Sequence, residues 1–404
     1  MINLSLNKKI IIFGFIFTFF SSFGQSFFLG LFNAPIRNDL GITHGQFGNL
    51  YATVTICSSL LLIWVGKKID DYKLINYSFF VIILLFLSSF FFSFINSIYF
   101  LAIGIFLMRF SGQGLMSHTS ATAITRFFDK SRGKALSTIW FGLSSAEFIL
   151  PVLVTYLFLI YSWRTVWQGI AILVILFLPL VILNTIRSIN LDSREDQKTN
   201  LKKIKIKNWK RKEVIKDYRF YIISLNMLAM PWIATGIFVY QSYITDSKLW
   251  STYTIPKAFM VYSIASIITL FSSGFLVDKF TSRKLIPVMN IPLLFAMIVL
   301  FYFQNEIYAY FFLGLIGVSN GLANVLGSST WAEIYGVKYI GSIRALTVAF
   351  MVFATAFGTA VFGILIDYGF SIERIAFVSG TYIIISWILL IIFRHTLEPV
   401  KLLK

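Results

Sequence analysis

Two charged side chains lie deep inside long apolar runs of the sequence, where a charge is costly and therefore points to function. Arg109 stands about eleven residues into the run 98–122, roughly 16 Å along a helix and so near the midplane of a bilayer. Its guanidinium offers a planar fork of donors that matches a carboxylate. The pattern predicts that Arg109 binds an organic anion; the alternative is a structural ion pair between two helices.

Glu147 lies at a similar depth in the run 135–159. A substrate anion that competes for Arg109 would release this carboxyl to take up a proton, which is a physical route to proton–anion symport. Permanent pairing with Arg109 is the alternative. His118, nearer the end of the run 98–122, titrates close to neutral pH and is a second candidate for proton coupling; a packing or hydrogen-bonding role is its alternative. Neither a metal nor a cofactor is expected.

A set of uncharged polar and aromatic residues completes the candidate substrate site. On the expected helices 1 and 10, spacings of three, four and seven place them on single faces, as hydrogen bonding to a modest solute requires. The alternative for each residue is an interhelical hydrogen bond that only supports packing. The set comprises Ser21, Gln25, Gln113, Tyr240, Gln241, Asn320, Asn324 and Trp331.

The composition requires a membrane environment for these residues. The chain is 57% hydrophobic and only 13% charged, and apolar runs of roughly 20 residues, each able to cross a bilayer, recur from end to end. Runs that are apolar on every side favour helices over a β-barrel. We expect twelve spans, at 10–32, 45–65, 74–94, 98–122, 135–159, 165–186, 220–243, 256–277, 285–303, 307–327, 341–366 and 375–393.

Charge between the runs predicts the topology. A basic stretch, 187–219, separates a six-helix bundle at 1–186 from a second at 220–393, and a tail follows at 394–404. Most Lys and Arg lie in loops on the side of the N-terminus, so both termini are expected to be cytoplasmic in a bacterial-type inner membrane. The stretch is read as an orienting linker or, alternatively, as a lipid-headgroup ligand. Nucleic acid is not an expected partner, because the basic residues do not form a folded basic face.

An internal repeat supports two related halves. Gly66 and Asp70 follow the second expected helix, and Gly274, Asp278 and Lys279, with Arg283 shortly after, follow the eighth. The repeat resembles the G-x-x-x-D-[RK]-x-G-[RK]-[RK] loop of the major facilitator superfamily. This resemblance implies an all-α membrane fold of two pseudo-symmetric six-helix bundles around a central cavity, and a gate function for these six residues. In the first copy, Asp71 and Lys73 replace a basic residue and a glycine of the pattern.

The resemblance extends to Arg109 and the glycines that follow it. In its overall sequence pattern, the chain resembles most the oxalate/formate and monocarboxylate branches. This resemblance implies a monomeric secondary transporter of a mono- or dicarboxylate, working by proton-coupled uptake or anion exchange with membrane lipid as its solvent. Ala146-Glu147 stands where exporters of the family have glycine-proline. Transport of neutral or amphiphilic solutes, of drug or sugar type, is the alternative, and a non-transporting receptor is a remote one. An enzyme is not expected, because no reactive cluster is visible.

Overall fold

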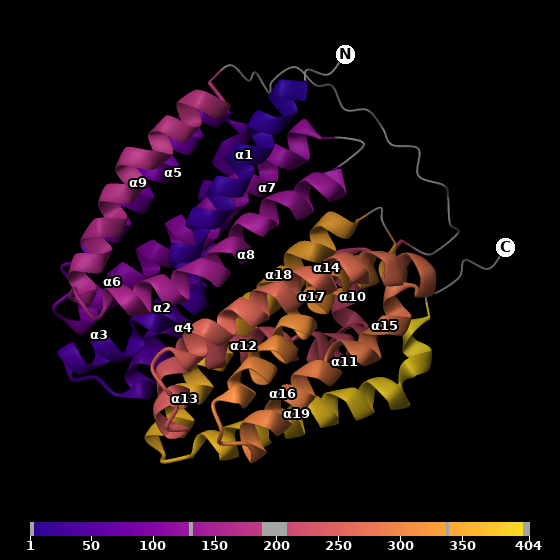
Figure 1. Cartoon of the computed structure of the whole chain (residues 1–404). Helices are drawn as coiled ribbons and strands as arrows, with labels where there is room; N and C mark the ends of the chain where they lie inside the picture. Colours follow the sequence, from indigo (N-terminus) through magenta and orange to yellow (C-terminus); the bar gives the residue numbers. More distant parts are fainter. Residues whose placement is uncertain (1–3, 129–131, 188–207, 337–338, 399–404) are drawn as a thin grey trace. The chain divides into compact units, whose positions relative to one another are not determined.

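The computed structural model describes residues 4–128, 132–187, 208–336 and 339–398, and helices make up most of them (Figure 1). The chain divides into two compact units. One comprises Met1–Asp196 with Phe238–Tyr243, and the other Gln197–Ile237 with Ile244–Lys404. The prediction of an all-α membrane protein is confirmed.

Eleven helical segments within the described part are long and apolar enough to cross a membrane. The first expected span, 10–32, is instead divided into three pieces, α1 (Leu4–Ser21), η1 (Ser22–Gly24) and α2 (Ser26–Leu31). The eleven segments are His44–Asp70, Leu74–Phe92, Ile98–Phe127, Lys134–Leu157, Trp163–Thr185, Tyr218–Val239, Thr254–Phe280, Ser282–Tyr302, Ile307–Tyr335, Ile343–Asp367 and Ile372–Ile392.

The first unit contains nine α-helices and three short segments of other helical geometry among its described residues. In chain order they are α1 (Leu4–Ser21), η1 (Ser22–Gly24), α2 (Ser26–Leu31), α3 (Asn33–Leu40), α4 (His44–Lys67), η2 (Lys68–Asp70), α5 (Leu74–Phe92), α6 (Ile98–Met108), η3 (Arg109–Met116), α7 (Ser117–Phe127), α8 (Arg132–Leu157) and α9 (Trp163–Thr185).

Local sequence sets several of these ends. The α4 helix starts at a capping box, in which Thr43 Oγ1 accepts from Gln46 N at 3.2 Å and Gln46 Oε1 accepts from Thr43 N at 2.9 Å. Gly41, at φ 62°, closes α3 in the left-handed conformation. Ser162 caps α9, accepting from Thr165 N at 3.2 Å. Short polar residues and a glycine therefore fix these three helix ends.

Trp167 forms the centre of the aromatic core of the first unit. It is fully buried, and its ring lies 4.6 Å from Phe92, 4.9 Å from Phe32 and 5.6 Å from Phe28. These rings come from α2, α5, α9 and the residue after α2, so one residue joins three membrane helices. Aromatic pairs at such separations stabilise the core by about 0.5–1.5 kcal/mol each beyond the area they bury.

A close crossing between the broken first helix and η3 depends on two glycines. A methyl group placed on Gly112 would lie 2.7 Å from the backbone nitrogen of Gly24, and one placed on Gly24 would clash with the carbonyl of Met108. Between η1 and α2, Gln25 is extended, with φ −82° and ψ 154°. The break therefore faces η3 backbone against backbone.

The second unit contains both long and interrupted helices. In chain order the remaining helices are α10 (Arg211–Lys216), α11 (Tyr218–Met227), α12 (Ala229–Val239), α13 (Gln241–Ser247), α14 (Thr254–Phe280), α15 (Ser282–Met289), α16 (Ile291–Tyr302), α17 (Ile307–Tyr335), α18 (Ile340–Asp367), α19 (Ile372–Ile392) and η4 (Arg394–Leu397). The expected seventh and ninth spans, 220–243 and 285–303, are thus each interrupted. Residues 238–243, from the end of α12 to the start of α13, group with the first unit.

Side chains satisfy the backbone groups that these interruptions release. At the α15–α16 break, Ser319 Oγ accepts from Leu293 N at 2.9 Å and donates to Met289 O at 3.0 Å. Asn290 Nδ2 donates to Asn226 O at 2.6 Å, and Tyr382 Oη donates to Leu225 O at 2.7 Å. Because lipid offers no hydrogen bonds, a break of this kind is stable only with such partners.

Part of the expected linker, 187–219, is folded. Residues 188–207 lie outside the described residues, as does most of the tail, 399–404. From residue 208 onward the chain forms α10, and Val214 joins a buried cluster with Phe220 and Trp331. The end of the basic stretch is therefore part of the second unit and not only a solvated charge run.

The crossing of Gly24 and Gly112 predicts a sharp difference between two glycine variants. We expect Gly112→Ala to lower the free energy of unfolding by about 1–3 kcal/mol through overpacking. Its control is Gly169→Ala on α9, where an added methyl meets nothing within 4 Å; there, helix propensity should raise stability by about 0.5–1 kcal/mol. Thermal unfolding of both variants in detergent measures this, and equal melting temperatures would contradict the tight crossing.

Candidate functional site

Arg109 lies at the start of η3 and reaches the break in the first helix. Its Nη1 donates to Gly24 O at 3.2 Å and to Ser26 Oγ at 3.3 Å. Tyr51 Oη donates to the same hydroxyl at 3.1 Å, and the guanidinium carbon lies 5.3 Å from the centre of the Tyr51 ring. A carbonyl, a hydroxyl and an aromatic face thus surround the cation.

The guanidinium is buried and lacks an anionic partner. Arg109 is 3% exposed, and its Nε donor has no hydrogen-bond partner. Within the described part of the chain, no carboxylate lies within ion-pair distance of it. In this conformation, then, Arg109 does not open onto water but faces neutral dipoles, and its charge is uncompensated.

Glu147 is also buried, at 7% exposed. It lies on α8 about one turn before Pro151, and no ion pair joins it to Arg109 among the residues that the structure describes. Permanent pairing of these two groups is therefore not what stabilises Arg109 here. One buried cation and one buried acid occur in the same unit without direct contact.

The local geometry of η3 explains how Arg109 is placed. Its eight residues, Arg109–Met116, are π-helical, a rare winding that is frequent at functional sites. Gly112 and Gly114 lower the cost of departing from α geometry, and Ser111 Oγ donates to Leu107 O at 2.7 Å in the preceding turn of α6. The sequence signal was the pair of glycines, but the winding itself was not predicted.

The remaining polar candidates of the first half have different surroundings. Ser21 is fully buried and donates to Thr18 O at 2.6 Å on its own helix. Gln25 stands half-buried at the helix break, and Gln113 is half-buried within η3. Of these three, Gln25 and Gln113 lie next to the Gly24–Gly112 crossing and hence close in the chain to the groups around Arg109.

Tyr240 and Gln241 belong to the short segment that groups with the first unit. Tyr240 Oη donates to His44 O at 2.9 Å, and Gln241 Nε2 donates to Phe27 O at 2.8 Å. The α13 helix begins at Gln241, just as α2 begins at Ser26 after Gln25. The repeated Gln-Ser dipeptides, Gln25-Ser26 and Gln241-Ser242, thus mark a helix interruption in both halves.

The candidates on α17 are spread over different environments. Asn320 Nδ2 donates to Ser266 Oγ at 3.0 Å, whereas Asn324 is exposed and donates to Asn320 O at 3.0 Å. Trp331 is 2% exposed and packs on Phe220 at 5.2 Å. The bond from Asn320 to α14 and the contact of Trp331 with Phe220 favour the packing alternative for these two residues, whereas the side chain of Asn324 is exposed.

The first copy of the gate motif is tied to α7. His118 Nε2 lies 3.0 Å from Gly66 O, so this imidazole holds the end of α4. Arg126 forms an ion pair with Asp70 and donates from Nη1 to Ile69 O at 3.2 Å. Arg126 was not predicted as a site residue, although its position two turns beyond His118 on the same helix would have suggested it.

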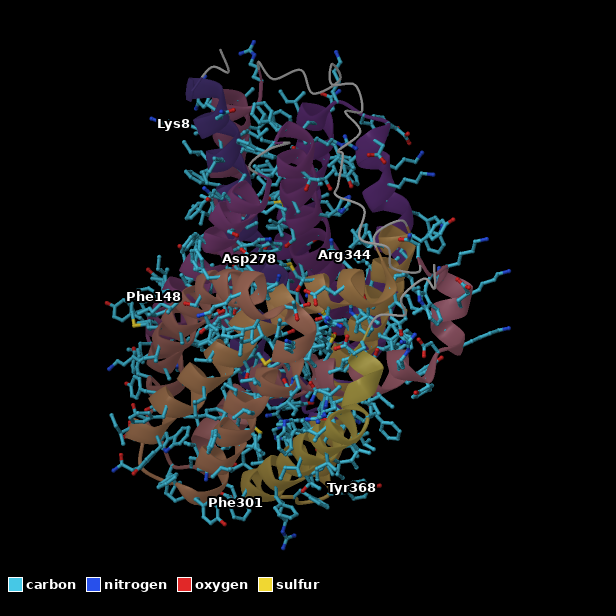
Figure 2. The ribbon with its side chains drawn as sticks, turned by 90° about the vertical axis from the view of Figure 1, so that its right-hand side faces the viewer. Lys8, Phe148, Asp278, Phe301, Arg344 and Tyr368 are labelled. Carbon is cyan, nitrogen blue, oxygen red and sulfur yellow. The ribbon has the colours of Figure 1, made fainter. Side chains whose placement is uncertain are left out.

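The second copy is more exposed. Asp278 and Lys279 are both exposed, and Lys279 Nζ lies 5.3 Å from the ring centre of Phe280; Figure 2 labels Asp278 and Arg344. Next to it, the Glu333 carboxylate caps α15, accepting from Ser282 N at 2.9 Å and from Arg283 N at 3.2 Å. Gly274 has open space beside it.

Arg283 pairs with Glu398. No pairing of Glu333 with Arg344 occurs among the described residues. The Glu333 carboxylate instead caps α15, because the N-terminal amides of that helix lie within its reach.

A buried ionic cluster in the second unit was not predicted. Arg219 donates from Nε to Asp217 Oδ2 at 2.8 Å, and Tyr335 Oη donates to the same oxygen at 3.1 Å. The guanidinium lies 5.0 Å from the centre of the Trp209 ring. The only sequence signal was an acid and a base two residues apart at the start of a span, which is too common to single out.

One polar group outside the spanning segments shows a clear electrostatic effect. Trp163 Nε1 donates to Asp39 Oδ2 at 2.7 Å, and Arg164 Nη1 donates to the same oxygen at 2.5 Å. The hydrogen bond from Trp163, followed by that from Arg164, lowers the pKa of Asp39 below its usual value.

For metal binding, no group of three His, Cys, Asp or Glu side chains able to hold an ion is found in the described ranges.

Comparison with known proteins identifies the fold. A family model described as Major Facilitator Superfamily matches residues 14–358. A bacterial homologue of the human lysosomal transporter Spinster, in an inward-facing and unoccupied conformation, is similar with a TM-score of 0.75 at 13% identity, over 98% of both chains. The nucleoside transporter NupG is similar with a TM-score of 0.73 at 12% identity, over 96% of this chain and 99% of that one. No curated protein matches the sequence.

His118 and Arg126 of α7 bind residues 66–70, the first copy of the gate motif, so removing one of these contacts should make that segment more mobile. We expect Arg126→Gln to speed amide hydrogen exchange in the peptide 66–73 by up to about fivefold, since a partly exposed ion pair is worth roughly 0–1 kcal/mol. Lys134→Gln removes an equal charge from an exposed side chain and is the control. Unchanged exchange in Arg126→Gln would show that His118 alone holds the loop.

Proposed function

The chain belongs to the major facilitator superfamily and is a membrane transporter, and from this premise we propose that it moves a small organic anion, a mono- or dicarboxylate, by alternating access. The proposal includes proton-coupled uptake or anion exchange, action as a monomer, and a cytoplasmic membrane with both termini inside. The charge distribution supports the orientation.

The uncompensated burial of Arg109 carries the substrate assignment. A buried ion without a counter-ion is unfavourable, and the described residues supply only the Gly24 carbonyl, the Ser26 hydroxyl and the Tyr51 ring. The unused Nε donor adds a directed site on the same plane. An anionic ligand would neutralise the charge and use this donor, and a carboxylate suits the guanidinium fork best.

Anion binding requires a change at the helix break. Because Arg109 is only 3% exposed, a solute reaches it only when η1 and α2 move relative to η3. Helix breaks near the bilayer midplane are typical of solute sites in transporters, since their freed backbone groups can exchange partners. The carboxylate would then replace Gly24 O and Ser26 Oγ as the acceptor from Nη1.

Glu147 supports a coupling role in the same unit. It is a buried acid without a basic partner among the described residues, so carrying a proton relieves its burial cost. Taking up a monocarboxylate at Arg109 and a proton at Glu147 together leaves the net charge of the unit unchanged, and a dicarboxylate would need a second proton for the same balance. Anion exchange without a proton is the other mode that this arrangement permits.

A neutral or amphiphilic solute is the second candidate. The observation that favours it is that Nη1 of Arg109 already caps the carbonyl freed at the helix break, which is a complete structural role. In that case the half-buried Gln25 and Gln113 of the first unit would bind the solute by hydrogen bonds alone. The Arg109→Lys variant described next distinguishes the candidates.

Arg109→Lys tests the anion site. A lysine keeps the charge but loses the planar fork, so we expect uptake of labelled carboxylates into proteoliposomes to fall by at least about tenfold, or about 1.4 kcal/mol. Arg374→Lys, at an exposed position on α19, should transport normally. A folded Arg109→Lys protein with unchanged carboxylate kinetics would remove Arg109 from the substrate site.

Glu147→Gln tests proton coupling. The amide stays neutral, so we expect uptake to lose its stimulation by an inward proton gradient, while counterflow exchange of the same anion falls by less than about twofold. Asp246→Asn changes an exposed carboxylate and serves as the control. Gradient stimulation that survives in Glu147→Gln would assign coupling to another group or to exchange.

A further inference from the structure

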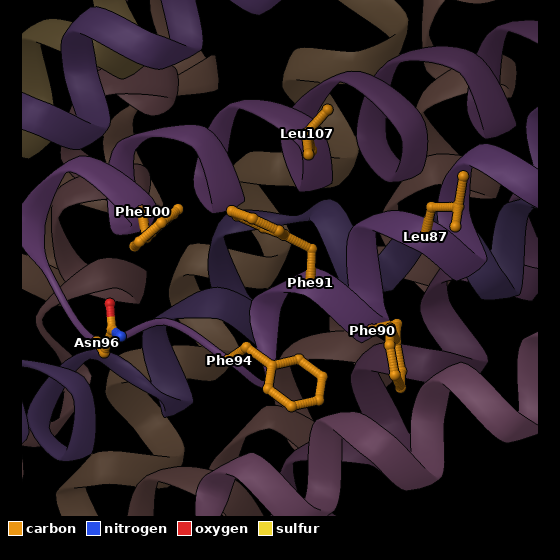
Figure 3. A pocket seen from close by; sticks show the side chains of 7 residues that line it. All are labelled: Leu87, Phe90, Phe91, Phe94, Asn96, Phe100 and Leu107. Carbon is orange, nitrogen blue, oxygen red and sulfur yellow. The ribbon is translucent and has the colours of Figure 1, made fainter.

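An aromatic groove lies on the membrane-facing side of the first unit, outside the candidate solute site. It has a volume of about 680 Å³ and is lined by Leu87, Phe90, Phe91, Phe94, Asn96, Phe100 and Leu107. Figure 3 shows Asn96 at one end and Leu87 at the other. Small-molecule sites have volumes of about 300–1,000 Å³, so the groove is large enough to hold part of a ligand.

The spacing of the lining residues creates the groove. Leu87, Phe90, Phe91 and Phe94 stand at i, i+3, i+4 and i+7, which places them in one stripe along α5 and the turn after it. Phe92 points the other way and packs on Trp167 at 4.6 Å. The aromatic stripe is therefore directed outward and is not part of the core.

The walls of the groove are organised and yet open to lipid. Phe90 and Phe94 meet edge to face at 5.0 Å, and Phe91 of α5 meets Phe100 of α6 at 5.8 Å. Leu87, Phe90, Phe94 and Phe100 keep exposures of 52%, 45%, 55% and 44%. Both helices cross the membrane, so hydrocarbon is the medium that meets these side chains.

The depth of the groove matches one leaflet. Leu87 and Phe94 are about seven residues apart, roughly 10 Å along a helix, within the roughly 15 Å of a single hydrocarbon leaflet. Asn96 lies at the edge: Arg164 Nη2 donates to the adjacent Ile95 carbonyl at 2.9 Å, and the guanidinium lies 4.2 Å from the centre of the Trp163 ring. Tryptophan and arginine of this kind mark the membrane interface.

From this arrangement we propose that the groove is a specific site for one acyl chain of a bilayer phospholipid. The chain lies along the α5 stripe between Phe94 and Leu87, against Phe100 and Leu107 of α6. The Asn96 amide donates to the ester or glycerol oxygens where the tail meets the headgroup. The leaflet is the one at the α5–α6 turn, opposite the gate loop 68–73.

Photo-crosslinking of the full-length protein in nanodiscs tests the site. The probe is a phosphatidylethanolamine with a diazirine midway along one acyl chain, and crosslinked peptides are identified by mass spectrometry. We expect crosslinks in the peptides covering 87–107 to exceed those on α9 by about tenfold, or about 1.4 kcal/mol of preferential occupancy. Leu176 and Leu180 on α9, at 65% and 58% exposed, provide the comparison.

Matched variants separate a bound lipid from the general lipid shell. Leu87→Trp fills the deep end of the groove from an exposed position and should abolish the excess, whereas Leu180→Trp should preserve it. Asn96→Leu should reduce the excess by removing the polar contact. Equal labelling of the groove and α9, or an excess that persists in Leu87→Trp, would overturn the proposal.

Discussion

A cation buried without an anion is the constraint on which the first unit depends. The guanidinium of Arg109 must be stabilised by dipoles, and the protein supplies them by interrupting its first helix at Gly24 and aiming the released carbonyl at Nη1. That contact requires two backbones to touch, which only Gly24 and Gly112 permit. The π-helical winding that begins at Arg109 belongs to the same arrangement. The buried charge of Arg109, the break in the first helix and the crossing of Gly24 and Gly112 therefore depend on one another.

Interrupted helices recur in the second unit, where the polar partners are different. Ser319 satisfies the α15–α16 break, and Asn290 and Tyr382 donate to the carbonyls of Asn226 and Leu225 near the end of α11. In lipid each of these bonds replaces one that water would otherwise make. A segment stabilised by a few side-chain bonds can change partners at a lower cost than an intact helix. Such positions suit a protein that must expose a buried site to each side of a membrane in turn.

The two copies of the gate motif show how a shared pattern acquires different contacts. In the first, Asp70 pairs with Arg126 and Gly66 is held by His118, while the unusual Asp71 forms only an exposed pair with Lys68 at 3.1 Å. An exposed pair of that kind contributes little, so the departure from the pattern at Asp71 is tolerated. In the second, Asp278 and Lys279 keep the motif residues but stay exposed. The motif predicts the end of a span, here α4 with η2 in the first copy and the last turns of α14 in the second, and the neighbouring residues decide what that end binds.

The sequence by itself determined the eleven segments long and apolar enough to span a membrane, the fold class and the family resemblance. These follow from local properties, because the length of an apolar run sets a span. It also singled out Arg109 and Glu147, because a charge in an apolar run is conspicuous without a structure. The tertiary structure alone decided that these two groups do not pair, that Trp331 is a core residue and that Arg126 and Tyr51 are partners of the candidate residues. Those outcomes depend on which helix faces lie against each other and on where a helix breaks, and both are set by contacts between residues far apart in the chain.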